Sequence, residues 1–260
     1  MLRSFYIAGT GMLTQRQKMD VIINNVTNTD TTGYKKDQVI SRTFDDLLLN
    51  RLNEDPNVLN TRTGTRISGN SEVGPQNTGV QVDELVIDWT QGPMEATGRQ
   101  TDMAITGDGF FAVQTPAGER YTRAGNFQVD SNGTLLTSDG NYVLGRNGGM
   151  INVGTGDFYV NQNGEVYVDN QQVGALRIVQ FADNGVLRKE GGNLFYALDG
   201  APQQMANPVV EQGLLEGSNL DVGREMAEML QTNRVYESSQ RMLRMVDESL
   251  EKTVNQIAQF

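Results

Sequence analysis

The sequence predicts an α+β protein with an amphipathic helix near each end and a central, mainly antiparallel β domain built of hairpins. Apolar residues recur in steps of three and four near both ends, which is typical of helices. In the middle they alternate with a period of two between Gly and Asn residues. The expected segments are a helix at 1–32, a helix with an extended or loop segment at 33–80, the β domain at 81–217 and a helix at 218–260.

The N-terminal helix is predicted by one apolar stripe that is interrupted at Gln15. The stripe consists of Phe5, Ala8, Met12, Met19, Ile22 and Val26. We expect the helix to end in the polar run at 27–33, because short polar side chains compete for backbone hydrogen bonds. Gly9 and Gly11 interrupt the apolar start, so neither a cleavable signal peptide nor a membrane-spanning helix is expected.

A longer helix is predicted near the C-terminus, after a capping-box-like run at Ser218 to Asp221. Its stripe consists of Val222, Met226, Met229, Tyr236, Leu243, Val246, Leu250, Val254 and Ile257. The stripe skips at Asn233 and Gln240, which favours packing among several helices over one long two-stranded coiled coil. Methionines on both helices suit either core packing or a surface that contacts partners.

Two kinds of structure are expected between the first helix and the β domain. A second, core-facing helix is predicted from Val39, Phe44, Leu47, Leu48 and Leu52. The following segment, 50–79, is rich in Asn, Thr, Gly and Ser, so it is predicted to be a loop or an irregular extended segment. A loop of that length is typical of a functional or partner-binding segment.

The β domain is predicted to contain hairpins with type I′ turns. Asn-Gly pairs recur at Asn132, Asn163 and Asn184, each between alternating apolar residues, which is a strong hairpin signal. The stretches 127–145 and 158–174 share the pattern F-x-V-x-x-N-G and therefore predict a repeated hairpin unit.

Composition excludes several classes of function. Lys plus Arg is 21 and Asp plus Glu is 32, and the net charge of −11 disfavours nucleic acid as a partner. Without Cys or His, the chain lacks disulfides, thiolate nucleophiles and the commonest metal ligand and general base. A glycosidase using carboxylates among Asp102, Asp108 and Asp139 stays open, although Asp beside Gly is typical of turns. We expect no catalytic residue, cofactor or metal.

Several blocks of the chain resemble the flagellar basal-body rod and hook family. They are 19–28 and 31–35 near the N-terminus, 91–99, 102–111 and 121–127 in the middle, and 215–222 with 234–237 near the C-terminus. The residues that match the family's motifs are Asn24, Asn25, Asn28, Gly33, Tyr34, Lys35, Gly107, Gly109, Phe110, Phe111, Ser218, Asn219, Arg234, Tyr236 and Glu237. Ile23, Val26, Thr27, Tyr34, Gly217 and Leu220 depart mildly from the commonest residues of those motifs.

The resemblance implies a structural subunit of the flagellar rod, in its distal part or as a rod-like paralogue of the same size. The two terminal helices would pair into a coiled-coil-like assembly domain and pack with neighbouring copies into a helical tube that transmits motor torque to the hook. Implied partners are further copies, other rod, hook and ring proteins, and the flagellar type III export apparatus. The residues expected to mediate self-assembly are Phe5, Met12, Met19, Ile22, Val26, Met226, Met229, Tyr236, Leu243, Leu250, Val254 and Ile257.

Two consequences and one alternative complete these expectations. Ordering a residue costs roughly 1 to 2 kcal/mol in backbone entropy, so we expect 1–32 and 218–260 to be largely mobile in the monomer and ordered in the polymer. The segment at 50–79 is the first candidate for a contact with an adjacent subunit. The alternative function is an extracellular carbohydrate-binding or adhesive β module, for which exposed aromatic side chains would be needed, with Trp89 as the sole Trp.

Overall fold

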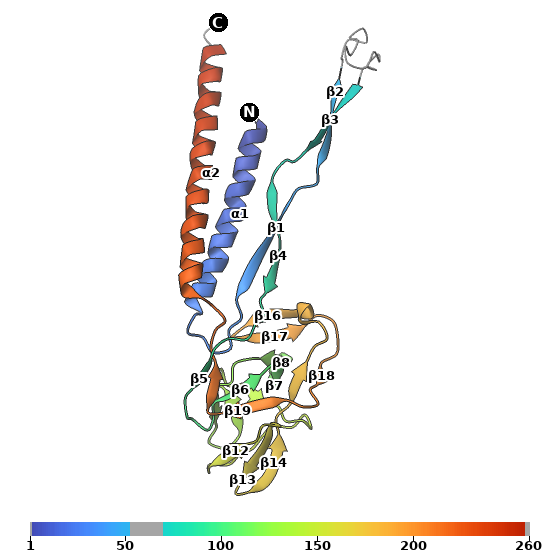
Figure 1. Cartoon of the computed structure of the whole chain (residues 1–260), viewed down its shortest axis with the longest axis vertical. Coiled ribbons are helices and arrows are strands. Elements are labelled where there is room, and N and C mark those ends of the chain that lie inside the picture. The colour runs from blue at the N-terminus through green and yellow to red at the C-terminus, as the bar shows by residue number, and fades with distance from the viewer. Residues whose placement is uncertain (1, 53–69, 258–260) are drawn as a thin grey trace. The chain divides into compact units, whose positions relative to one another are not determined.

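The computed structural model describes residues 2–52 and 70–257, which form two compact units (Figure 1). One unit contains the described parts of Met1–Ile22, Val39–Leu85 and Ala227–Phe260. The other contains Ile23–Gln38 and Val86–Met226. We call them the helical unit and the β unit. Among the described residues, no helix combines the length and the apolar character that crossing a membrane requires.

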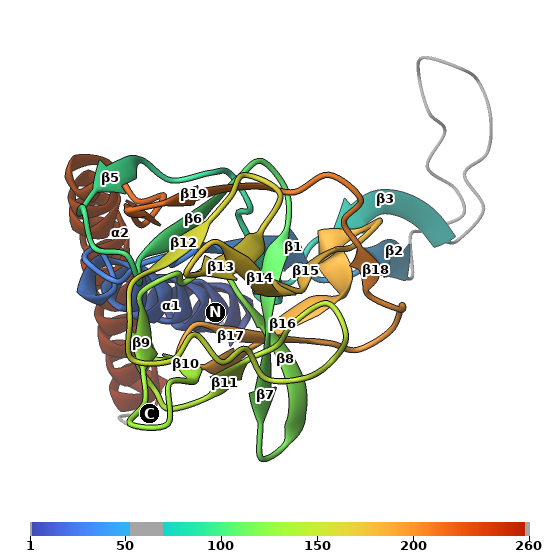
Figure 2. The same ribbon diagram turned by 90° about the horizontal axis from the view of Figure 1, so that it is seen from below.

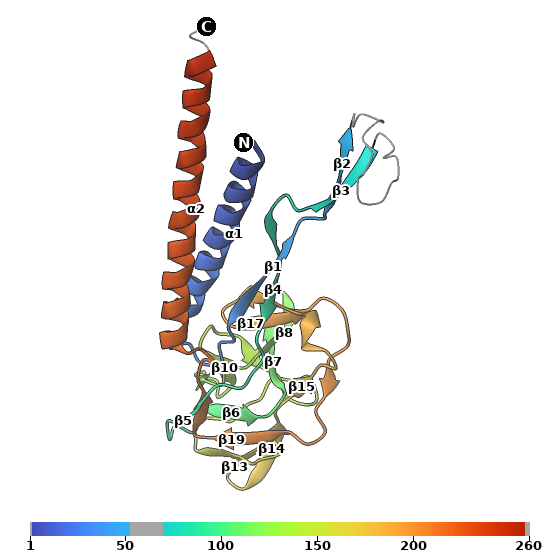
Figure 3. The ribbon, with the colours of Figure 1, turned by 45° about the horizontal axis from the view of Figure 1, so that its top comes forward.

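The two predicted terminal helices are confirmed. They are α1 (Leu2–Thr27) and α2 (Val222–Ile257), which lie side by side in opposite directions (Figures 1 and 3). The Lys18 ammonium is 2.7 Å from the Glu228 carboxylate, so these two positions lie level with one another along the helices. The predicted cap at Ser218 is wrong: the Asp221 side chain accepts a hydrogen bond from the Arg224 N–H at 3.2 Å, so α2 starts three residues later than that cap would place it.

The predicted stripes are only partly covered. Ala8 and Ile22 of α1 are buried, and Thr232 of α2 is buried where the apolar pattern skips at Asn233. Met226 and Val254 are exposed, although they belong to the predicted stripe. The side chain of Ile257 lies outside the described ones. A small polar residue can therefore continue a helix seam that apolar spacing alone does not reveal.

The predicted helix between α1 and the β domain is wrong. This part of the chain forms β1 (Asp37–Thr43), β2 (Leu47–Leu52), β3 (Asn70–Gln76) and β4 (Val80–Ile87). β1 pairs with β4, and β2 pairs with β3 in antiparallel register from Leu47 opposite Gln76. Backbone pairing with a distant strand outweighs the weak helical spacing, and Val and Ile in β1 favour extended backbone. The expected loop at 50–79 is replaced by strand at 50–52 and 70–76, while 53–69 lies outside the described residues.

The central antiparallel β domain is confirmed in the β unit. A nine-stranded sheet has the order β16-β17-β8-β7-β11-β10-β9; in addition β15 pairs with β7, and β18 pairs with β15. Separate small sheets are β12-β13-β14 (Figure 2), β19-β6 and β20-β5. The strands are β5 (Met94–Ala96), β6 (Met103–Thr106), β7 (Phe110–Thr115), β8 (Gly118–Thr122), β9 (Phe127–Val129), β10 (Leu135–Thr137), β11 (Tyr142–Val143), β12 (Phe158–Val160), β13 (Glu165–Val168), β14 (Gln171–Ala175), β15 (Ile178–Gln180), β16 (Leu187–Gly191), β17 (Leu194–Ala197), β18 (Gln203–Gln204), β19 (Val209–Gln212) and β20 (Leu214–Glu216).

β7 is buried on both faces and separates two apolar clusters. Phe111 and Val113 enter the larger cluster, which also receives residues from β6, β9, β10, β12 and β13. Phe110 and Ala112 point to the opposite face, where Trp89 packs edge-on against Phe110 at 5.3 Å between ring centroids. Because side chains alternate between the two faces of a strand, neighbouring residues of β7 pack into different apolar clusters.

The repeated hairpin unit is confirmed. The N–H of Asp130 donates to Thr134 and that of Gly133 to Asp130, and the same two bonds recur at Asn161 and Gly164. In both turns only the Gly has a positive φ, so these are not the predicted type I′ turns. Paired positive φ values occur instead at Asp169-Asn170, between β13 and β14, and at Gly192-Asn193, between β16 and β17.

The hairpin predicted at Asn184-Gly185 is wrong. Asn184–Val186 forms a short 3-10 helix, and the flanking strands β15 and β16 pair with other strands. The Asp183 side chain accepts a hydrogen bond from the Gly185 N–H at 2.7 Å, which favours the helical turn.

Candidate functional site: a buried polar cluster

Seven polar residues from both ends of the sequence and from its middle lie close together in the β unit, where five are buried, Asn219 is half-buried and Asn24 is exposed. We call them the polar cluster; its members are Asn24, Asn25, Tyr34, Lys35, Arg123, Glu216 and Asn219. All but Arg123 and Glu216 are residues predicted from the family motifs. The end of α1 and the turn after it supply the first four members. The polar cluster therefore joins the two terminal segments to the β strands.

Side-chain hydrogen bonds end α1 just before the chain enters this cluster. The Asn28 side chain donates to the Asn24 carbonyl at 2.8 Å, and the Thr31 hydroxyl donates to Asn28 at 3.3 Å. The predicted helix end in the polar run is thus confirmed, and its side chains satisfy backbone groups that the helix leaves open.

Gly33 turns the chain where no side chain fits. Its φ is +67°, and a Cβ there would lie 2.5 Å from the backbone of Arg123 and Ala124. Its N–H donates to the Glu216 carbonyl at 2.7 Å. Both the left-handed conformation and the close backbone approach therefore require Gly at this position.

An ion triad forms the centre of the cluster. The Lys35 ammonium lies 2.6 Å from Glu216 Oε1, and Arg123 Nη1 lies 3.3 Å from Glu216 Oε2. The side chains of Lys35 and Glu216 are 0% exposed, and that of Arg123 is 4% exposed. Lys35 also donates to the Thr90 carbonyl at 2.7 Å, and Arg123 donates to the Gly107 carbonyl at 2.6 Å. Carbonyl oxygens thus supply further acceptors to two cations that share one carboxylate, while the buried Arg123 Nε has no partner among the described residues.

Burial is the largest influence on the pKa values of the two cations of the triad. It lowers the pKa of Lys35, while the hydrogen bond and charge of Glu216 act in the opposite direction. Burial likewise lowers the pKa of Arg123, against the attraction of Glu216. The carboxylate is therefore the group that keeps both cations charged inside the unit.

Asn25 and Tyr34 tie the end of α1 to the start of β1. The Asn25 amide donates to the Asp37 carbonyl at 2.9 Å and accepts from the Asp37 N–H at 3.0 Å. The Tyr34 hydroxyl donates to Asn24 and Asn25 at 3.0 and 3.1 Å. Burial, followed by the charges of Asp37 and Glu225, raises the pKa of Tyr34, so it stays protonated and acts as a donor.

Asn219 makes the matching connection before α2. Its Oδ1 accepts from the Lys36 N–H at 2.9 Å, and its amide donates to the Asp88 carbonyl at 2.8 Å. One amide thus bridges the segment after α1 and the residue that follows β4. The amide supplies both the donor and the acceptor that these two partners need.

Lys189 is a contributor that the sequence did not reveal. Its ammonium donates to the Lys35 carbonyl at 2.6 Å, lies 2.8 Å from Asp37, and sits 4.2 Å from the centre of the Tyr34 ring. Burial lowers its pKa and Asp37 opposes this change. No periodicity or short motif links Lys189 to residues that precede it by more than 150 positions, so sequence spacing offers no signal for it.

Several other motif residues lie outside the polar cluster. Gly109 precedes the core residues Phe110 and Phe111, and Ser218 is buried with no partner for its hydroxyl in the described part of the chain. Arg234, Tyr236 and Glu237 belong to α2 in the helical unit, where Glu237 pairs with Arg241 at 3.5 Å. These three therefore take no part in the polar cluster.

The residues weighed for catalysis or sugar binding do not form such a site. Asp102 is buried and pairs with Arg99 at 2.9 Å, whereas Asp108 and Asp139 are exposed. Trp89 is half-buried and packs against Phe110 and Phe195 of the second apolar cluster. The polar cluster is closed to solvent at its charged centre, so its geometry suits holding segments together.

Comparisons with known proteins agree with this interpretation. Residues 5–35 match the flagella basal body rod protein family, 104–168 match the flagellar hook protein FlgE/F/G D1 domain, and 211–257 match the flagellar basal body rod FlgEFG protein C-terminal family. These three segments contain all seven members of the polar cluster. Arg123 lies in the second match and Glu216 in the third.

Three curated relatives span nearly the whole chain. The flagellar basal-body rod protein FlgG of Bacillus subtilis strain 168 is 34% identical over 98% of this chain and 99% of its own length. The rod protein FlgF of Caulobacter vibrioides is 32% identical over 92% and 91%, respectively. The hook-basal body complex protein FlhO of Bacillus subtilis is 30% identical over 100% of both. None of these matches supports a carbohydrate-binding module or a glycosidase. The chain therefore belongs to the flagellar basal-body rod and hook family, whose members are structural proteins of the basal body and not enzymes.

Proposed function

We propose that this chain is a subunit of the distal rod that assembles with copies of itself into a helical tube and transmits motor torque to the hook. In this proposal α1 and α2 form the assembly surface, and the polar cluster fixes both helix ends to the β unit. A contact that does not close on itself produces an open filament, which is the architecture a rod requires. Relatives named FlgG, FlgF and FlhO all match, so the position along the rod is part of the proposal.

The observation that carries the proposal is the apolar surface of the two helices. Exposed large apolar residues on them are Phe5, Tyr6, Ile7, Leu13, Ile23, Met226, Leu230, Val235, Met242, Met245 and Val254. Burying one such side chain contributes about 1.5 to 3 kcal/mol, so repeated contacts along two helices can drive assembly. Apolar surface of this extent on a helix pair is typical of an interaction site.

The proposed partners are further copies of the chain together with other rod, hook and ring proteins. Export through the flagellar type III apparatus is part of the same proposal. A chain without Cys suits that route, because no disulfide has to form or break when an unfolded chain passes through a narrow channel.

The proposal is tested by Leu250→Asp in the full-length chain, with Glu248→Asp as the control on the polar face of the same helix turn. Electron microscopy and sedimentation measure filament formation. Fluorescence of Trp89, which lies in the β unit, measures folding of that unit. We expect Leu250→Asp to abolish filaments, because a carboxylate in an apolar contact is costly, and to leave the fluorescence transition unchanged.

Normal filaments from Leu250→Asp would contradict the assembly role of the α2 stripe. If the wild-type chain forms no filaments at any concentration, a motility assay decides whether it has a rod function. The assay uses a strain that lacks the gene and is complemented with each variant. Full motility without the gene would exclude a rod function.

A further inference from the structure

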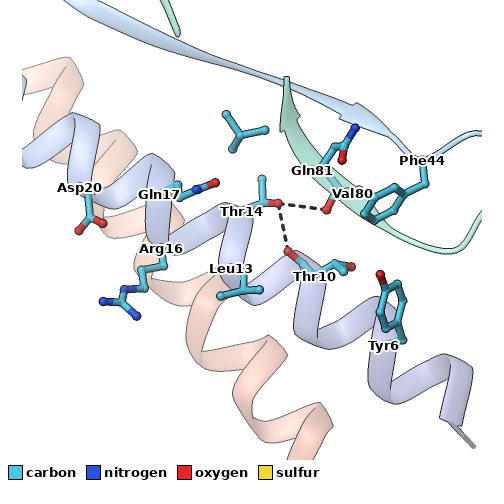
Figure 4. Close-up of a pocket in the computed structure, with 11 residues that line it drawn as sticks. Tyr6, Thr10, Leu13, Thr14, Arg16, Gln17, Asp20, Phe44, Val80 and Gln81 are labelled. Atoms are coloured by element: carbon cyan, nitrogen blue, oxygen red, sulfur yellow. Dashed lines mark hydrogen bonds between the residues drawn. The ribbon is translucent and has the colours of Figure 1, made fainter. Parts of the chain in front are cut away.

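A groove with a volume of about 560 Å³ lies in the helical unit, between α1 and the segment that carries β1 and β4 (Figure 4). Tyr6 and Leu13 line it from α1, and Phe44, Val80 and Val82 line it from the opposite wall. Tyr6 and Leu13 are 55% and 57% exposed, so the apolar wall is open to solvent. Arg16 and Gln17 stand on the rim.

One hydrogen bond, from Thr14 of α1 to the Val80 carbonyl, joins the two walls of the groove. The Thr14 hydroxyl lies 3.0 Å from the Thr10 carbonyl and 3.3 Å from the Val80 carbonyl (Figure 4). A Cβ on Gly79 would lie 2.5 Å from the Thr10 hydroxyl, so strand and helix are in close contact there. The Tyr6 and Phe44 rings lie 6.3 Å apart at the open end. The groove is therefore built before any partner arrives.

Among the described residues, no helix lies beside the last turns of α2. Lys18 and Glu228 are level, so Leu2, sixteen residues before Lys18, is level with Arg244, sixteen residues after Glu228. Residues 245–257 therefore extend past the start of α1 over about 20 Å. Because α2 is a continuous helix, this end cannot fold back into the groove of the same chain.

This helix end carries an apolar row with acidic side chains beside it, and the groove has apolar walls with one basic and one acidic lining residue, Arg16 and Asp20. Val246, Leu250 and Val254 follow one another at four-residue spacing on one face, and Val254 is 62% exposed. Asp247 and Glu251 flank that row. Neither acidic residue, nor Arg16 on the groove rim, makes an ion pair within the described ranges.

We propose that residues 245–257 of a second copy of this chain dock in the groove, with Leu250 and Val254 against Tyr6, Leu13 and Phe44 and with Glu251 facing Arg16. This inference rests on the proposed self-assembly and names the surfaces that make one of its contacts. A single copy presents both surfaces and can use neither for itself, so each added copy leaves a new groove and a new helix end. The contact is heterologous and propagates along a filament.

The absence of Cys allows a direct test by disulfide trapping in full-length chains. A Leu13→Cys chain is mixed with a Val254→Cys chain, polymerised and oxidised, and linked peptides are quantified by mass spectrometry. The matched control replaces Val254→Cys with Met245→Cys, because Met245 is also 62% exposed and lies nine residues away, on the opposite face of the helix. We expect at least about ten times more linkage to position 254 than to position 245, since apposed residues have a high effective concentration.

Each outcome decides between the two proposals. Filaments with equal linkage, or with none, would overturn the docking contact and leave self-assembly standing. A wild-type chain that never forms filaments overturns both.

If only the Cys variants fail to assemble, Arg16→Glu and Glu251→Arg are compared singly and together at low salt. We expect each single variant to raise the critical concentration several-fold and the combination to restore it. A combination that remains as impaired as the single variants would overturn the contact.

Discussion

Two ion pairs that each join distant parts of the chain differ in their surroundings. In the β unit, Lys35 and Glu216 are 2.6 Å apart and 0% exposed. In the helical unit, Lys18 and Glu228 are 2.7 Å apart, but their side chains are 37% and 40% exposed. The buried pair is supported by Arg123 and by backbone groups, whereas the exposed pair joins two helices that carry exposed apolar side chains.

This difference separates folding from assembly. Breaking a buried pair leaves an uncompensated charge in a low-dielectric interior, so the β unit holds one arrangement of its segments. An exposed pair contributes only about 0 to 1 kcal/mol, so the two helices can adjust to one another when neighbours arrive. The β unit encloses its central ion triad, and the helical unit leaves apolar surface for copies of the chain.

The strongest test of this comparison is Glu216→Gln. The substitution keeps the shape but leaves Lys35 and Arg123 without a counter-charge, so we expect the free energy of unfolding to fall by about 3 to 5 kcal/mol. Urea unfolding followed by Trp89 fluorescence measures the loss. Glu190→Gln removes a surface partner of Arg120 and is expected to leave the midpoint unchanged. Equal effects of the two variants would refute the distinction between buried and exposed pairs.

The next largest effect is expected for Gly33→Ala. Gly33 and Gly98 share nearly the same φ, +67° and +69°, but only at Gly33 would a Cβ meet backbone atoms, while Gly98 faces open space. We expect Gly33→Ala to lower the free energy of unfolding by about 1 to 3 kcal/mol more than Gly98→Ala, because crowding adds to the shared strain. The same urea titration measures both. Similar losses would show that close packing around Gly33 is not what requires Gly there.

A smaller effect concerns alkaline pH. Burial, reinforced by Glu119, raises the pKa of Tyr121 to about 12. The folded state therefore keeps a proton that the unfolded state releases above its ordinary pKa near 10, so this contribution is complete below pH 10 and declines as pH rises toward 12. We expect the urea midpoint to fall less steeply between pH 9 and 11 in Tyr121→Phe than in the wild type. Tyr159→Phe, at an exposed position, should retain the wild-type slope.

The smallest effect is expected for Lys18→Met. Loss of the exposed pair with Glu228 should change the free energy of unfolding by less than about 1 kcal/mol, and the difference from wild type should shrink in high salt. Circular dichroism at 222 nm, which follows helix content, measures it in the full-length chain. A loss as large as that of Glu216→Gln would erase the contrast between the two units.

Local patterns predicted the parts of the fold that local physics controls. Steps of three and four along 5–26 and 222–257 indicated α1 and α2, and the F-x-V-x-x-N-G repeat indicated two turns with matching hydrogen bonds. The helix predicted at 39–52 failed, because Leu47 to Leu52 pair with a strand that begins only at Asn70. The capping residue of α2 was displaced to Asp221, because several residues near that end can cap a helix.

The site was predicted in part. Family motifs pointed to Asn25, Tyr34, Lys35 and Asn219, but nothing local assigned a partner to any of them. Glu216 is separated from Lys35 by 181 residues and from Arg123 by 93. At such separations neither hydrophobic period nor short spacing carries information about contact. Self-assembly by the predicted stripe residues stays a prediction, for which the exposure of Val254 and Met226 gives the first places to test.

By itself, the sequence determined the two helices, the β domain between them, the lack of thiol and imidazole chemistry, and the family resemblance. Each follows from composition, from short-range periodicity or from motifs that are contiguous in the chain. Only the tertiary structure decided that Lys35, Arg123 and Glu216 share one buried site and that α2 extends past α1. The physical reason is that the free energy of a buried charge depends on which groups surround it in space, and strand and helix packing set that neighbourhood across the whole chain.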